Sequence, residues 1–79
     1  MRLAERIEAN PGVMMGKPVI RGTRVPVELI LRRISEGAQE EDLMASYPHL
    51  TRADIRAALA YAADTIAYEE IVEAAAHSD

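Results

Sequence analysis

The chain has no cysteine, tryptophan or phenylalanine among its 79 residues. Without cysteine it can form neither a disulfide nor a thiolate site, which favours a reducing compartment such as the cytoplasm. No uninterrupted apolar run approaches the length of a membrane span, and the first residues lack the apolar centre of a signal peptide. We therefore expect a cytoplasmic protein with no membrane partner.

What the chain does have is a high hydrophobic content, 49 % of its residues, which favours a compact domain over a disordered tail. A chain of this length forms one domain with a small core. Such a core gains stability when a second chain adds buried surface, so we expect a homodimer.

Charge is distributed unevenly, although the net charge of −4 is mild. Up to Arg33 seven basic residues face three acidic ones, whereas beyond it only Arg52 and Arg56 face ten acidic residues. This asymmetry predicts two surfaces with different partners. A solvated charge pattern without a partner is the alternative.

Gly-Thr at residues 22–23 separates two short apolar runs, which predicts a β-hairpin with a type II′ turn. The expected register pairs Ile20 with Val25 and Arg21 with Arg24. One face of the hairpin then carries its apolar side chains, Pro18, Ile20, Val25 and Val27. Because like charges across a ribbon repel, the arginines indicate an anionic ligand such as nucleic acid. The alternative is a solvated surface turn.

Helical patterns surround the hairpin. Residues 2–9 are compatible with a short amphipathic helix that stops before Pro11. A second helix is predicted from Val27 to a stop at Gly37, and a third over residues 40–46.

The start of the last helix is the clearest local signal after the hairpin. Thr51 with Asp54 matches a variant of the capping box, so the helix should begin at Arg52. No glycine or proline interrupts it as far as His77, which gives roughly 26 residues and about 39 Å. A domain of this size can cover only the first half of such a helix.

Two apolar stripes run along this helix. The stripe expected to face the core consists of Ile55, Leu59, Ala62 and Ile66. The second stripe consists of Ala58 together with the candidate partner-interface residues Tyr61, Thr65, Tyr68 and Val72. A helix with two apolar faces needs two packing partners, so the second should be another chain. The alternative is a bend near Asp64 that folds the helix back.

These elements predict a mostly α single domain: a short N-terminal β-hairpin, then a three-helix helix-turn-helix domain, homeodomain-like or winged-helix-like, with a long C-terminal helix. The arm and hairpin span residues 10–27, the helix-turn-helix core 27–61 and the helical extension 62–79. In this geometry the start of the third helix enters the major groove of DNA. The candidate DNA-binding residues are Lys17, Arg21, Arg24, Arg52 and Arg56.

No constellation for catalysis is evident. His49 and His77 are far apart and have no cysteine between them, so no metal site is expected. The serines have no evident histidine partner for nucleophilic activation. We therefore expect neither an enzyme nor a cofactor.

One long motif carries a family resemblance: Gly-Lys-Pro-Val-Ile-Arg-Gly-Thr-Arg-Val-Pro-Val at residues 16–27. Three shorter motifs accompany it: Asn10-Pro11-Gly12, Tyr47-Pro48-His49-Leu50-Thr51 and Ala57-Ala58-Leu59-Ala60-Tyr61. From Ile7 to Tyr61 the chain resembles the prokaryotic "domain of unknown function 433" family. Gln39 departs from the pattern, because such sequences tend to have a Ser or Thr helix cap there.

The resemblance implies a predicted antitoxin with a helix-turn-helix domain, paired with a nuclease-like toxin. Together with the arginine placement, it leads us to expect a DNA-binding antitoxin of a type II toxin-antitoxin system that represses its own operon. Its partners would be a toxin protein, operator DNA and a second copy of itself. Two alternatives are a small dimeric interaction module without DNA binding and a non-catalytic subunit of an enzyme.

Overall fold

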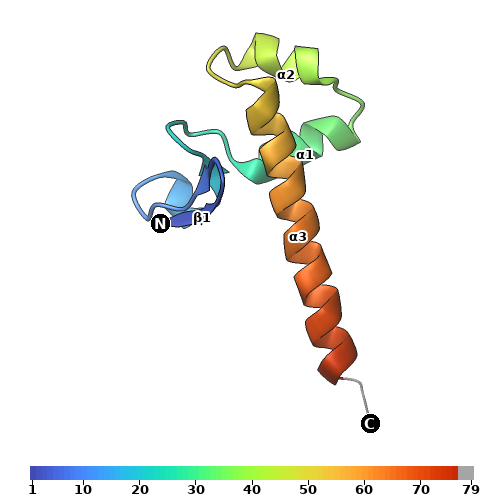
Figure 1. Ribbon diagram of the computed structural model, residues 1–79. Helices are drawn as coiled ribbons and strands as arrows, with labels where there is room; N and C mark the ends of the chain where they lie inside the picture. The colour runs from blue at the N-terminus through green and yellow to red at the C-terminus, as the bar shows by residue number, and fades with distance from the viewer. Residues whose placement is uncertain (77–79) are drawn as a thin grey trace.

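The computed structural model describes residues 1–76, with side chains described for residues 1–69. In this part of the chain three short strands come first and three helices follow (Figure 1). The strands β1, β2 and β3 span Arg2–Ala4, Ile7–Glu8 and Val19–Ile20. The helices α1, α2 and α3 span Val27–Ser35, Glu40–Ser46 and Arg52–Ala76. The prediction of a mostly helical domain with a small N-terminal β element is confirmed.

The prediction of a helix over residues 2–9 is wrong, because these residues form β1 and β2 of an antiparallel sheet in the order β1-β2-β3. Ile7 pairs with Ile20 of β3, and both side chains are buried. A short isolated helix is marginal in water, since it makes few hydrogen bonds for the residues it orders. Pairing of β2 with β1 on one side and with β3 on the other gives the strand residues hydrogen-bond partners and buries Ile7.

The loop after β3 turns one residue earlier than predicted. Thr23 N–H donates to Ile20 O at 3.0 Å, so Gly22 is the third residue of the turn. Its φ of +79° suits a type II turn, and the predicted type II′ turn is wrong. The expected pairing is kept, because Ile20 N–H donates to Val25 O at 3.0 Å. The Thr23 hydroxyl fixes the loop, donating to Ile20 O and accepting from Val25 N–H.

The helix ends follow the local sequence signals. Gly37, at φ +101°, ends α1 in a Schellman motif, with hydrogen bonds from Gly37 N–H to Ile34 O and from Ala38 N–H to Arg33 O. At the start of α3 the predicted capping box is present. Thr51 N–H donates to Asp54 Oδ2 at 3.0 Å, and Asp54 N–H donates to Thr51 Oγ1 at 3.1 Å.

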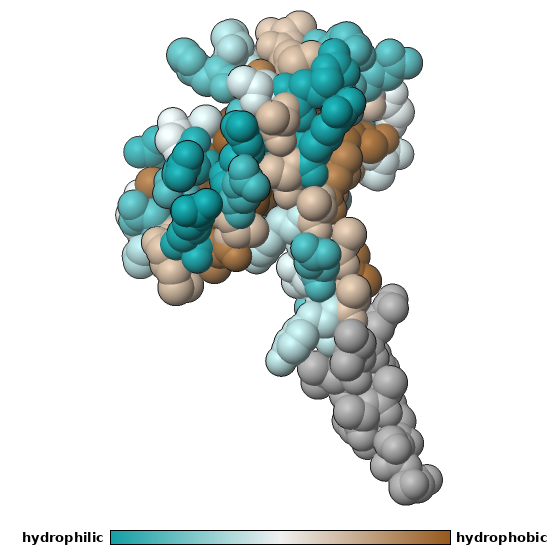
Figure 2. Space-filling model, in the orientation of Figure 1, coloured by the Kyte–Doolittle hydropathy of each residue, from teal (hydrophilic) through white to brown (hydrophobic). Residues whose placement is uncertain are grey.

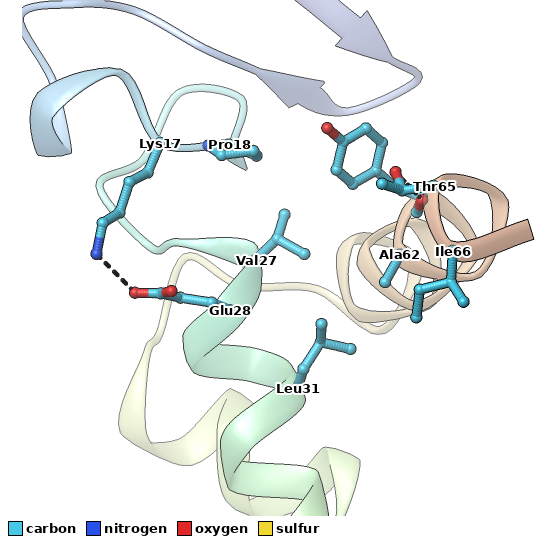
Figure 3. Close-up of a pocket in the computed structure, with 9 residues that line it drawn as sticks. Lys17, Pro18, Val27, Glu28, Leu31, Ala62, Thr65 and Ile66 are labelled. Atoms are coloured by element: carbon cyan, nitrogen blue, oxygen red, sulfur yellow. Dashed lines mark hydrogen bonds and ion pairs between the residues drawn. The ribbon is translucent and has the colours of Figure 1, made fainter. Parts of the chain in front are cut away.

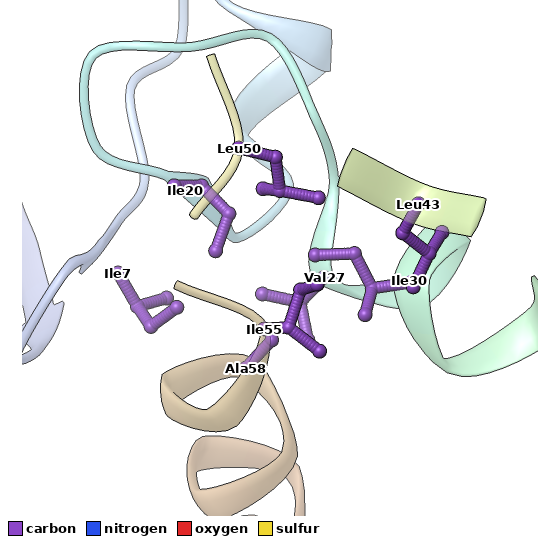
Figure 4. Close-up of a cluster of buried hydrophobic side chains, with 8 residues drawn as sticks. All are labelled: Ile7, Ile20, Val27, Ile30, Leu43, Leu50, Ile55 and Ala58. Atoms are coloured by element: carbon purple, nitrogen blue, oxygen red, sulfur yellow. The ribbon is translucent and has the colours of Figure 1, made fainter. Parts of the chain in front are cut away.

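The core lies where the sheet meets all three helices (Figure 4). Its buried side chains are Ile7, Ile20, Val27, Ile30, Leu43, Leu50, Ile55 and Ala58. Half-buried residues such as Tyr47 and Tyr61 surround this cluster. Burial of these aliphatic groups is the main favourable contribution to folding, and it fixes the position of α3 against β2 and α1.

The inward face of α3 is rotated from the predicted one. Ile55 is buried as expected, but Leu59 and Ile66 are 37 % and 55 % exposed. Ala58, assigned to the partner-facing stripe, is fully buried, and Tyr61 packs against the core. An alanine-rich helix is apolar on several sides, so its periodicity does not select one face. The small side chain of Ala58 lets this side of α3 approach the core closely, and this packing determines which face of the helix is buried.

α3 continues without a break to Ala76, so the alternative of a bend near Asp64 is wrong. Its 25 residues correspond to about 38 Å. In Figure 1 the second half of α3 extends away from the sheet and from the other helices. The expectation that the domain covers only the first half of this helix is confirmed.

Candidate nucleic-acid and partner surfaces

The first two turns of α3 carry Arg52 and Arg56, and α2 presents carboxylates to both. Arg52 Nη1 donates to Glu40 Oε2, and Arg52 Nη2 donates to Glu41 Oε1 at 3.0 Å. Arg56 Nε lies 3.8 Å from Glu40 Oε1. The hydrogen bonds that Arg52 donates to Glu41 and Glu40 raise the pKa of its guanidinium. These four side chains tie the start of α3 to the start of α2.

The first turn of α2 is a favourable place for these carboxylates. The positive end of the helix dipole stabilises acidic groups there. A backbone hydrogen bond, followed by the hydrogen bond from Arg52, lowers the pKa of Glu41 below its ordinary value of 4.5. Sequence reasoning missed the contacts of Glu40 and Glu41 with the two arginines, because residues 11 to 16 positions apart meet only when α2 and α3 are packed.

The loop arginines are in a different situation. Arg21 and Arg24 are exposed, and within residues 1–69 neither side chain is within ion-pair distance of a carboxylate. Arg21 N–H donates to Arg6 O at 2.8 Å, and the Arg6 guanidinium donates to Asp54 Oδ1 at 3.1 Å. Arg6 therefore links the loop that carries two free cations to the capping carboxylate of α3.

The loop after β3 also lies beside the turn between α2 and α3. Residues 22–25 and 46–50 line the two sides of a groove of about 560 Å³. Arg24 and His49 both line it, together with Tyr47. The structure therefore brings one of the predicted DNA-binding residues next to the turn between α2 and α3.

Lys17 lies at another groove, between α1 and α3 (Figure 3). Lys17 Nζ donates to Glu28 Oε1 at 2.8 Å, and this hydrogen bond lowers the pKa of the Glu28 carboxyl. Beside the pair, Val27 and Leu31 of α1 point toward α3 across an apolar space of about 330 Å³. Lys17 thus has a partner of its own, unlike Arg21 and Arg24.

The described residues of the predicted interface differ in how far they are exposed. Tyr61 packs against the core and lines the apolar groove, and Thr65 lines the same groove. Tyr68 is 69 % exposed, while the side chain of Val72 lies outside the described residues. Ile66, which was expected to face the core, lines the groove and is half exposed. Figure 2 shows hydrophobic surface along one side of α3 below the globular part.

The described part of the chain contains neither a metal-binding cluster nor a membrane-spanning helix. Among the side chains of residues 1–69, no group of three or more histidine, aspartate or glutamate residues is arranged to hold a metal ion. No helix within residues 1–76 is long and apolar enough to cross a membrane.

Comparison with known proteins places the chain among relatives of unknown activity. It is 36 % identical over 58 residues to the uncharacterised protein y4eO of Sinorhizobium fredii. The match covers 73 % of this chain but only 26 % of that protein, so the chain spans about a quarter of the length of this relative.

A solved structure is similar throughout. The crystal structure of a DUF433 member protein from Anabaena variabilis matches with a TM-score of 0.74 and 36 % identity, covering 95 % of this chain and 72 % of that one. The model of the family described as protein of unknown function (DUF433) matches residues 7–62, from β2 into the middle of α3. The match therefore spans β2, β3, α1, α2 and the first part of α3, and the chain belongs to the DUF433 family.

Proposed function

We propose that this chain is a DNA-binding antitoxin of a type II toxin-antitoxin system, which represses its own operon and neutralises a nuclease-like toxin. The observation that carries the proposal is the arrangement of α2, a short turn and α3, with Arg52 and Arg56 at the start of α3 and Arg24 beside the turn. In helix-turn-helix proteins this end of the second helix meets the base edges of the major groove.

The arginines divide between two kinds of DNA contact. Those of α3 lie where base edges are read, and arginine is the usual reader of guanine. Arg21 and Arg24, exposed on the loop, suit the phosphates that flank the groove. The link through Arg6 to Asp54 supports a fixed distance between the loop and α3.

The second half of α3 suits a protein partner. Ile66 and Tyr68 are exposed there, and exposed apolar surface on a projecting helix favours helix-to-protein contact. Family resemblance, through predicted antitoxins with this domain, supports a nuclease-like toxin as that partner. The residues of this end of the chain would bind it while the first half of α3 stays in the domain.

A homodimer completes the proposal. The core contains few large side chains for a chain of this length, so added interface would stabilise the fold. Two-fold symmetry would place two copies of α3 about one DNA turn apart, near 34 Å, and the operator would be a palindrome.

The test is to purify the native protein from its host under mild conditions and to identify both the DNA and the protein bound to it. The proposal predicts DNA from upstream of its own gene and a nuclease-type chain. Recovery of neither would refute it, and recovery of the protein alone would refute DNA binding.

One alternative has an observation in its favour. Arg52 has both of its terminal nitrogens bonded to Glu40 and Glu41, so part of the basic surface is neutralised. A protein-interaction module without DNA binding would have no use for free guanidinium groups at this position. Purification of such a module from its host would recover a single protein partner and no DNA.

A further inference from the structure

The two arginines at the start of α3 are held differently by α2. Arg52 uses both terminal nitrogens, one for each glutamate, and its side chain is 45 % exposed. Arg56 faces Glu40 through Nε, and its side chain is 69 % exposed. Within residues 1–69 the Arg56 guanidinium donates no hydrogen bond, so its two terminal nitrogens are free to bind a ligand.

This difference matters for reading a base. Guanine is read by two parallel N–H donors of one guanidinium, which bind O6 and N7. Arg52 would have to release Glu40 or Glu41 to present such a pair. Arg56 can present its terminal nitrogens while its Nε stays next to the carboxylate.

Glu40 is the residue that connects the two arginines. Its side chain is only 26 % exposed, compared with 63 % for Glu41, and it contacts both Arg52 and Arg56. An arginine side chain loses rotamer entropy when it docks on a base. A fixed carboxylate beside Nε restricts those rotamers before DNA arrives.

We infer that Arg56 is the side chain of α3 that reads a guanine, that Glu40 is its positioning residue, and that Arg52 holds α2 to α3. This inference rests on the proposed DNA binding. It gives different roles to Arg52 and Arg56, which the sequence alone does not distinguish because they lie four residues apart on one face of the helix.

Glu40 and Glu41 offer a matched pair of variants. Glu40→Gln and Glu41→Gln each remove one negative charge from the same helical turn, and each keeps the shape of the side chain. Both changes should therefore raise affinity for DNA of any sequence by a similar factor. Only Glu40→Gln loses the contact with Arg56.

The experiment starts from a pool of random duplex DNA, from which the full chain selects its preferred sequence. Affinities of each variant for the selected duplex and for a shuffled duplex are then measured at one salt concentration. Glu40→Gln should lower the ratio of the two affinities about tenfold, because one positioned arginine–guanine contact discriminates by that order. Glu41→Gln should leave the ratio within about twofold.

Arg56→Lys gives an independent readout that does not disturb α2, because the side chain is exposed and lysine has no guanidinium fork. It should lower the ratio as far as Glu40→Gln does and relax one base position in the selected sequence. The double variant should be no worse than Arg56→Lys alone, as expected for residues that act through one contact. Thermal melting of each variant checks that the fold is kept.

Three results would overturn the inference. If the wild type selects no sequence, the proposed function fails and this inference fails with it. If the wild type selects a sequence but Glu40→Gln and Glu41→Gln have the same ratio, DNA binding stands and the role of Glu40 is wrong. If Arg52→Lys relaxes a base position and Arg56→Lys does not, the roles of the two arginines are reversed.

Discussion

The two halves of α3 are both rich in alanine but have different surroundings. In the first half Ile55 and Ala58 are fully buried, and the capping box at Thr51 fixes where the helix begins. In the second half Ile66 and Tyr68 are more than half exposed. One helix therefore has two environments, since its start is part of the core and its far part is exposed.

The largest effect should come from removing the exposed half. A chain truncated after Asp64 keeps every residue of the buried cluster, so it should remain folded and keep some of its DNA contacts. Neutralisation of the toxin should be abolished, because the contact surface beyond residue 64 is absent. Growth of cells that express the toxin with the truncated chain measures this. Rescue by the truncated form would show that the exposed half is not the toxin contact.

An Ile→Ala substitution should lower the free energy of unfolding more in the buried first half of α3 than in its exposed second half. Ile55→Ala should lower the free energy of unfolding by about 2–5 kcal/mol, because it leaves a cavity in the core. Ile66→Ala, at a half-exposed position, should cost less than about 1 kcal/mol. Urea denaturation of both variants gives the two values, and similar losses would mean that the far half of α3 is covered as well.

A charge in the exposed half should weaken self-association. Tyr68 belongs to the second apolar stripe of the helix, where we expect a second copy of the chain to pack as well as the toxin. Tyr68→Glu would bury a carboxylate there without a counter-charge and should shift the protein toward the monomer. Sedimentation in the ultracentrifuge should give twice the chain mass for the wild type. A wild-type monomer at micromolar concentration would contradict the proposed homodimer.

The smallest effect concerns the loop beside the start of α3. Arg21→Ala and Arg24→Ala should each weaken binding to all DNA sequences alike and reduce the slope of log K against log salt by about 0.9. Band shifts over a range of salt concentrations on one duplex give the slope. An unchanged slope for both variants would exclude phosphate contacts by this loop.

The sequence predicted the parts of this fold that short-range chemistry decides. The ends of α1 and the start of α3 follow from Gly37 and from the Thr51–Asp54 pair, whose hydrogen bonds are within one helical turn. The exposure of Arg21 and Arg24 also followed from the sequence, because the predicted hairpin has its apolar side chains on the opposite face.

What failed depends on contacts between distant residues. The spacing of apolar residues in 2–9 fits a helix, and only the pairing of Ile7 with Ile20 makes it a strand. The inward face of α3 was misjudged because alanine is compatible with both faces, so packing decided in favour of Ala58. The contacts of Glu40 with Arg52 and Arg56 require the angle between α2 and α3, which no local pattern contains.

Specific DNA binding can be tested by comparing the affinities of the wild-type chain for two duplexes. The wild-type chain is titrated at physiological salt into duplex DNA from immediately upstream of its own coding region, and into a shuffled duplex of the same composition. The upstream duplex should be bound at least about 10³-fold more tightly than the shuffled one, as is typical of specific DNA-binding proteins. Equal affinity for the two duplexes would contradict it.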